Sequence, residues 1–98
     1  MNSYIIYYLL TGTRGGMSRI DILKLLQKKS LNAHQIKEKL NLDYKTVQHH
    51  LRLLVKHRFI SISGERYGAM YHLADEFKLH FSVFKEILAK INKSPERS

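Results

Sequence analysis

The chain has 98 residues, 44% of them hydrophobic, and this length and composition predict one small domain with a modest core. Lysine and arginine number 17 against 8 acidic residues, and the formal charge of +9 favours a polyanionic partner: DNA, RNA or a membrane surface. Cysteine is absent, which excludes a disulfide framework and a thiolate metal site and suits a reducing, cytoplasmic compartment.

An apolar run opens the chain, from Tyr4 to Leu10, with no positive charge before it. The run is too short to span a bilayer and lacks the flanking charge of a signal peptide, so we predict neither a membrane span nor a leader. We expect a buried helix here, with a strand as the alternative.

Three glycines interrupt the pattern in residues 11–16. Ser18 and Asp21 then stand at capping-box spacing, which predicts a helix from near Ser18 to Ser30. Arg14, inside the glycine segment, has two interpretations: a contact to phosphate, or part of a helix connector that needs permissive dihedral angles. The connector is favoured, and a phosphate-cradling P-loop is excluded because its sequence pattern is absent.

A pair of short helices joined by a tight turn is predicted next. Asn32 and Gln35 repeat the capping-box spacing ahead of a short amphipathic segment. Residues 41–43, Asn-Leu-Asp, combine a residue that tolerates left-handed backbone geometry, an apolar residue and a good N-cap, as a helix-to-helix turn requires. The second helix of the pair is predicted over residues 44–57.

This second helix, residues 44–57, has an apolar side and a polar, net positive side at the helical period. The positions predicted to face inward are Val47, His50, Leu51, Leu54 and Val55. The positions predicted to face outward are Tyr44, Lys45, Gln48, His49 and Arg52. The outward side is therefore suited to a negatively charged partner.

A basic hairpin is predicted directly after this helix. Residues 59–63 alternate as a half-buried strand, residues 64–68 form a turn that carries Arg66, and residues 69–73 return as a second strand. Two capped helices, a tight turn and a hairpin in this order outline a winged helix-turn-helix, which is a mainly α fold with a small β-hairpin.

The last predicted helix, residues 74–92, carries two apolar stripes: Phe77, Phe81, Phe84, Leu88 and Ile91, and beside them Leu79, Val83 and Ile87. Together the stripes cover roughly 200° of helix surface, whereas a helix packed on one core needs about 100° or a little more. The surplus predicts a symmetric homodimer that pairs through the terminal helices. The alternative is that the second stripe covers the chain's own N-terminal helix.

The sequence LDYKTVQHHLRLL, residues 42–54, resembles the recognition-helix signature of ArsR-like winged-helix transcriptional regulators. The glycine segment 12–16 and the hairpin segment 64–71 also resemble members of that family. The resemblance covers roughly residues 11–73, which it identifies as the DNA-binding core. We predict a single winged-helix domain over residues 1–98, with flanking, dimerising helices at 1–10 and 74–92 and a flexible tail at 93–98.

The resemblance implies that helix 44–57 is a recognition helix, which enters the major groove of double-stranded DNA with support from the wing 59–73. The implied DNA-binding residues are Tyr44, Lys45, Thr46, Gln48, His49, Arg52 and Arg66. The alternative for each residue is an ordinary solvated position on the surface.

Four of these side chains have expected roles. Gln48 suits a bidentate contact with adenine, and Lys45 and Arg52 suit contacts with guanine or phosphate. Arg66, at the tip of the wing, is placed to reach a minor groove or a phosphate. We therefore expect base reading to depend on the helix and the wing to support it.

Six histidines raise the alternative of a metal-responsive repressor, but their spacing counts against it. His49 and His50 are adjacent on a helix and therefore diverge. Glu76 and His80 stand four positions apart and would supply only part of a ligand set. We predict no metal site and no cofactor, and we expect His50 to pack or to form a hydrogen bond inside the domain.

Other function classes find less support. Scattered acidic residues and the lack of a Ser/His/Asp arrangement do not predict an enzyme. A membrane-surface module, using Lys78, Lys85 and Lys90 beside the apolar stripe, is a weak rival. A winged helix that binds proteins and not DNA is the more serious alternative. RNA is less favoured because an exposed helix does not fit the deep major groove of an A-form duplex.

Overall fold

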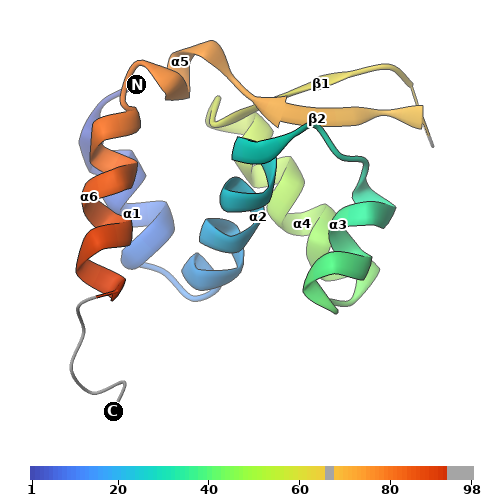
Figure 1. Ribbon diagram of the computed structural model, residues 1–98, viewed down its shortest axis with the longest axis horizontal. Coiled ribbons are helices and arrows are strands. Elements are labelled where there is room, and N and C mark those ends of the chain that lie inside the picture. The colour runs from blue at the N-terminus through green and yellow to red at the C-terminus, as the bar shows by residue number, and fades with distance from the viewer. Residues whose placement is uncertain (66–67, 93–98) are drawn as a thin grey trace.

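The computed structural model describes residues 1–65 and 68–92. In chain order its elements are α1 (Ser3–Thr11), α2 (Gly16–Lys28), α3 (Ala33–Leu40), α4 (Tyr44–Lys56), β1 (Ile60–Ser63), β2 (Met70–Leu73), α5 (Asp75–Lys78) and α6 (Phe81–Asn92). Figure 1 shows α1 and α6 side by side at one end, and α3, α4 and the hairpin at the other, with α2 between them. The predicted winged helix-turn-helix fold, mainly α with one β-hairpin, is confirmed. Arg66 and the predicted tail 93–98 lie outside the described residues.

The helix-turn-helix forms around the capping residues predicted for it. Asn32 Oδ1 accepts a hydrogen bond from Gln35 N at 2.8 Å, and Asn32 N donates to Gln35 Oε1 at 2.8 Å, which completes the capping box of α3. Asn41 ends α3 in the left-handed region, with φ of 54°. The Asp43 carboxylate then accepts hydrogen bonds from two amides in the first turn of α4. These local interactions set the short turn between α3 and α4.

The hairpin packs on α2 and α4 through its base. Strands β1 and β2 are antiparallel, with Ile60 opposite Leu73 and Ser63 opposite Met70. A further backbone pair joins Tyr71 to Leu31, just before α3, with Tyr71 N donating to Leu31 O at 2.8 Å. The predicted half-buried alternation of β1 is wrong at its outer end, because Ile62 is 48% exposed where the hairpin extends beyond the core.

The N-terminal run is a helix, not a strand, and it buries Ile6, Leu9 and Leu10. Helix α2, however, begins at Gly16 and not near Ser18. Its N-cap is Gly15, with φ of 88° and no side-chain capping bond, so the predicted capping box at Ser18 is wrong. Gly16, the first residue of α2, must be glycine because a Cβ at this position would overlap the Leu10 carbonyl of α1.

The predicted last helix is divided. Helix α5 ends at Lys78, and α6 starts at Phe81. The change of direction lets Phe77 stack on Phe59 below the hairpin, with ring centroids 5.1 Å apart, while Phe84 meets Phe77 edge-on at 5.5 Å. Aromatic packing in the core therefore explains a break that the hydrophobic periodicity did not reveal.

Helix α6 packs on α1 of the same chain. The Tyr7 hydroxyl donates a hydrogen bond to Glu86, and the Lys90 ammonium lies 5.6 Å from the centre of the Tyr7 ring. In the second predicted stripe, Ile87 is buried and Val83 half-buried, which agrees with the alternative in which that stripe covers the N-terminal helix. Leu79 alone of that stripe is exposed, at 83%.

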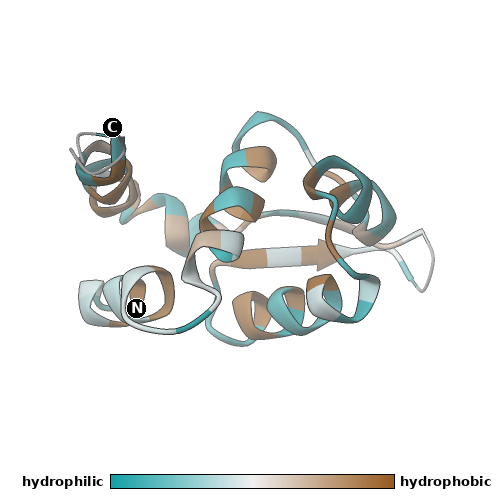
Figure 2. Ribbon diagram, turned by 90° about the horizontal axis from the view of Figure 1, so that it is seen from below, coloured by the Kyte–Doolittle hydropathy of each residue, from teal (hydrophilic) through white to brown (hydrophobic). Residues whose placement is uncertain are grey.

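Apolar and polar positions alternate around the helices, as Figure 2 shows by hydropathy. The buried apolar side chains form one cluster to which α1, α2, α3, α4, the hairpin, α5 and α6 all contribute. Among the described helices, none combines the length and the apolar character that crossing a membrane requires.

The close approach of α1 and α2 at Gly16 yields a test of the packing. We expect Gly16→Ala to lower the free energy of unfolding by about 2 kcal/mol or more, because the added methyl group displaces backbone rather than a flexible side chain. Gly68→Ala is the matched control, since a Cβ there has no neighbour within 4 Å, and it should change stability by less than about 0.5 kcal/mol. Urea unfolding of the two variants provides the measurement; equal stabilities would refute this account of the helix contact.

Candidate nucleic-acid interface

Helix α4 presents a polar face to solvent. The exposed side chains of this face are Tyr44, Lys45, Thr46, His49 and Arg52, and Gln48 beside them is half-buried. The opposite face buries Val47, His50, Leu51 and Leu54. The predicted division into inward and outward positions is therefore confirmed, with Val55 half-buried at its edge. The role of the outward residues in DNA binding stays a prediction.

The polar face is held in place because both ends of α4 are fixed. At the start, Asp43 adds a negative charge to the positive end of the helix dipole. At the end, Phe59 N donates to Leu54 O at 2.9 Å and Arg58 N donates to Val55 O at 3.0 Å, the two bonds of a Schellman motif. Arg58 occupies the left-handed position of that motif, with φ of 65°.

The hairpin stands beside the C-terminal half of α4. A cavity of about 370 Å³ separates them and is lined by residues that include Arg52, Lys56, Ile62 and Tyr71. Tyr71 lies at the base of the hairpin beside this cavity, and burial raises the pKa of its phenol. The base of the wing and the polar face of α4 therefore form one continuous surface, while the predicted contact of Arg66 falls outside the described residues.

A buried arginine joins this surface to the rest of the molecule. Arg19 of α2 is 2% exposed, yet no ion pair among the described residues involves it. Its Nε donates to Leu9 O at 2.9 Å, and its Nη2 donates to Thr13 Oγ1 and, at 3.2 Å, to Arg14 O. Its Nη1 lies 3.1 Å from His50 Nδ1 on α4. Arg19 thus connects α1, the glycine segment and α4 through hydrogen bonds.

The role of Arg19 was not predicted from the sequence. The available signal was its phase: Arg19 lies on the same helix face as the buried residues Ile22, Leu23 and Leu26. A basic residue on an apolar face at the first turn of a helix indicates a buried hydrogen-bonding role, because such a group is seldom buried without partners. Burial also lowers its pKa, although an arginine remains charged at neutral pH.

His50 is the partner of Arg19 on α4 and is 5% exposed. Burial, together with the charges of Arg19 and His49, lowers its pKa to about 4, so the imidazole is neutral at pH 7. Because a guanidinium only donates, Nδ1 accepts from Arg19 and the ring proton resides on Nε2. The expectation that His50 forms a hydrogen bond inside the domain is confirmed.

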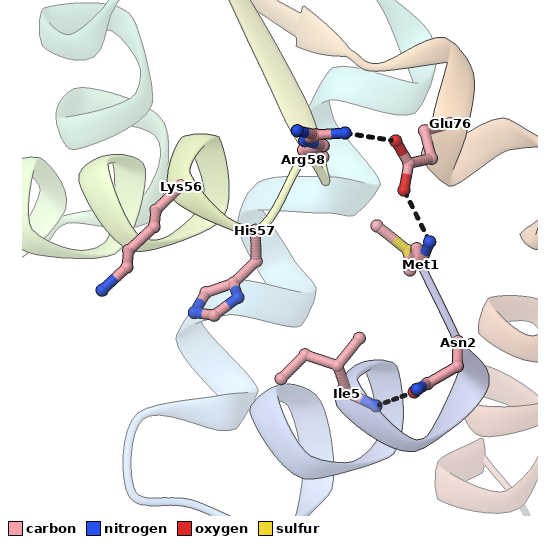
Figure 3. Close-up of a pocket in the computed structure, with 7 residues that line it drawn as sticks. All are labelled: Met1, Asn2, Ile5, Lys56, His57, Arg58 and Glu76. Carbon is pink, nitrogen blue, oxygen red and sulfur yellow. Dashed lines mark hydrogen bonds and ion pairs between the residues drawn. The ribbon is translucent and has the colours of Figure 1, made fainter.

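The metal-site alternative finds no support in the geometry. Within residues 1–65 and 68–92, no group of three or more His, Cys, Asp and Glu side chains is arranged to hold a metal ion. Glu76, one of the ligands considered above, instead contacts the Met1 ammonium at 2.7 Å and Arg58 Nη1 at 3.5 Å (Figure 3). The hydrogen bond from the Met1 ammonium is the main reason why the pKa of Glu76 is lowered.

Comparison with known proteins finds a match for the segment that contains the helix-turn-helix. Residues 17–61, which run from α2 into β1, match the model of a family described as bacterial regulatory proteins, arsR family. This segment is similar to the helix-turn-helix of that family. The chain therefore has the fold of ArsR-family regulators, which implies DNA binding in the regulation of transcription.

Solved structures share the fold over most of the chain. HlyU from Vibrio cholerae N16961 has a TM-score of 0.63 at 18% identity, covering 89% of this chain and 97% of its own. The transcriptional regulator HlyU from Vibrio vulnificus CMCP6 has a TM-score of 0.65 at 23% identity, covering 88% and 90%. M. tuberculosis Rv0081 has a TM-score of 0.68 at 17% identity, covering 93% of both chains. No curated protein matches the sequence.

The depressed pKa of His50 predicts a pH dependence of folding. From pH 6.5 down to about 4 the unfolded chain binds a proton at this residue and the folded chain does not, so folding stability falls as the pH is lowered through this window. The loss should reach roughly 3 kcal/mol at the lower end.

His50→Gln isolates this contribution, because its amide oxygen still accepts from Arg19 but does not titrate. Denaturant unfolding of both proteins at several pH values should show a shallower loss in the variant. Parallel curves, or an imidazole that titrates near its ordinary pKa by NMR, would contradict the buried neutral state.

Proposed function

We propose that this chain is a transcriptional regulator that binds specific sequences in double-stranded DNA through α4, with support from the hairpin. The observation that carries the proposal is the exposed polar face of α4, with Lys45, Gln48 and Arg52, on an ArsR-family helix-turn-helix. The major groove of B-form DNA admits such a helix and displays a distinct pattern of donors and acceptors for each base pair.

Each side chain of this face has a role consistent with its exposure. Gln48 binds adenine through its amide, and Lys45 and Arg52 donate to guanine or to phosphate. Tyr44 and Thr46 contact the backbone through their hydroxyl groups, because Asp43 already occupies the amides of Lys45 and Thr46 at the start of α4. His49 extends the same surface, and Arg66 adds a contact from the wing.

We further propose that two copies of the chain pair through α1 and the segment of α5 and α6. Tyr4 is 74% exposed and stacks on Tyr8 of the same helix, and Leu79 stands out from the junction of α5 and α6. Large apolar groups exposed on the terminal helices support an interface there. A symmetric dimer would present two α4 helices to half-sites about one helical turn apart on DNA.

A salt series measures the contribution of α4 to DNA binding. We expect affinity for duplex DNA to fall steeply with log salt, because cationic side chains release counterions from the phosphates. The triple variant Lys45→Ala, Gln48→Ala, Arg52→Ala should bind at least about tenfold more weakly and with a shallower salt slope. Fluorescence anisotropy with a labelled random-sequence duplex reports both quantities.

The matched control for that experiment removes two cations and one amide from the exposed face of α2: Lys24→Ala, Gln27→Ala, Lys28→Ala. The control has the same net charge as the α4 variant. If α4 has a specific role, the control should bind DNA more tightly than the α4 variant does. If both variants lose DNA affinity equally, the effect is due to overall charge and not to the position of these side chains on α4. No binding of the native chain at low salt would favour the protein-interaction alternative.

Sedimentation tests the proposed dimer. The native chain should sediment as a dimer at micromolar concentration, and Tyr4→Lys with Leu79→Lys should shift it to a monomer, because buried unpaired ammonium groups are costly. Met17→Lys with Ile62→Lys is the control, since it changes two other exposed apolar residues away from the terminal helices. A native chain that sediments only as a monomer rules out the dimer.

A further inference from the structure

A second cavity lies between the start of α2 and the first half of α4. It has a volume of about 640 Å³, and its lining includes Arg14 and Ser18 from one side and Lys45, Thr46 and His49 from the other. The cavity is separate from the one beneath the hairpin, with which it shares no residue. None of the described residues that line it is acidic.

The polar groups around this cavity are rich in hydrogen-bond donors. Arg14 and Lys45 are exposed cations, and Ser18 and Thr46 contribute hydroxyl groups. The Asp43 carboxylate, the nearest acid along α4, is engaged by two backbone amides and does not line the cavity. The balance of charge at this point therefore favours an anion.

A buried group also lines the cavity. His50 is 5% exposed, and its Nδ1 is taken by Arg19, which leaves the proton on Nε2. Among the described residues, no acceptor is found for this N–H. A Cβ on Gly15 would lie 2.9 Å from His50 Cε1, so glycine allows the loop to close against the ring. Within the described residues, every fully buried side-chain nitrogen and oxygen has a partner, so this N–H is reached by solvent at the cavity wall. An anion in the cavity would supply its acceptor.

The start of α2 adds free backbone donors. Its N-cap Gly15 provides no side-chain capping bond, and within the described part of the chain the N–H groups of Met17 and Ser18 have no acceptor. Free amides in the first turn of a helix, with the positive end of its dipole, attract negative charge. Ser18, which carries one of these amides, lines the cavity together with Arg14 and Lys45.

We propose that this cavity binds a phosphate-class oxyanion. The anion belongs either to the backbone of DNA held by α4 or to a small phosphate-bearing ligand. The first source rests on the proposed DNA-binding function, because Lys45, Thr46 and His49 lie on the helix that would enter the groove. The second source does not depend on DNA binding. A small anion would then bind beside the polar face of α4.

A tethered carboxylate tests the site. Ser18→Asp places a negative charge among the free amides, where it competes with a bound anion while suiting the first turn of α2, so the variant should fold. Ser30→Asp is the matched control, because it adds the same charge just beyond the opposite end of α2. Arg14→Gln is a second variant, which removes a cation without adding an acid.

The first readout is an NMR titration of the full chain with inorganic phosphate at constant ionic strength, with chloride as the reference anion. Phosphate should shift the amide signals of residues 16–18 and the ring signals of His50 saturably. Ser18→Asp should weaken phosphate binding by at least about tenfold, and Arg14→Gln by a smaller factor. Ser30→Asp should leave phosphate binding unchanged. The proposal is overturned if phosphate causes shifts no larger than those caused by chloride, or if Ser18→Asp binds phosphate as tightly as the native chain.

The second readout separates the two sources. If the anion is a DNA phosphate, Ser18→Asp should lower DNA affinity several-fold more than Ser30→Asp at the same salt concentration. If both variants bind DNA equally while phosphate binding is lost only in Ser18→Asp, the site serves a small anion. If the native chain binds phosphate at this site but not DNA, the proposed function fails and the anion site stands.

Discussion

The guanidinium of Arg19 is the interaction on which the arrangement of the molecule depends. It is buried without a carboxylate, which is costly unless its donors are satisfied. Here they are satisfied by the last turns of α1, by the glycine segment and by His50 of α4. The end of α1, the glycine segment and α4 are thereby fixed relative to one another. Removal of any acceptor would leave part of the charge uncompensated.

The hydrogen bonds of Arg19 link the proposed DNA-binding helix α4 to the terminal helices. His50 and His49 are neighbours on α4, one held by Arg19 and the other exposed on the polar face. The network that orients α4 therefore also reaches α1, which packs on α6. If the terminal helices pair as we propose, the spacing of two α4 helices in a dimer would be set through this same set of hydrogen bonds. The neutral state of His50 matters for it, because an imidazolium could not accept from Arg19.

Much of the fold was accessible from sequence because it is encoded locally. The capping box of Asn32, the left-handed Asn41 and the N-cap Asp43 each act within a few residues, and together they define the helix-turn-helix. The outward face of α4 followed from periodicity for the same reason. Its chemistry as a DNA surface was suggested by the family resemblance, not by periodicity.

The features that sequence reasoning missed depend on contacts between distant elements. Helix α2 starts at Gly16 because α1 approaches it there, and the last helix breaks because Phe77 packs on Phe59. The partners of Arg19 could not be predicted because its acceptors come from three other segments, although its place on the apolar face of α2 indicated burial. The proposed anion cavity was not predicted from the sequence: for Arg14 the helix connector was favoured over a phosphate contact, and Ser18 was assigned to a cap that does not form.

A map of amide chemical shifts of the isotopically labelled chain, with and without duplex DNA at low salt, would show directly whether the outer face of α4 meets DNA. We expect the largest changes along α4 and at the start of α2, smaller ones in the hairpin and the smallest at the end of α6. Changes concentrated on α1 and α6, with α4 unaffected, would contradict this expectation.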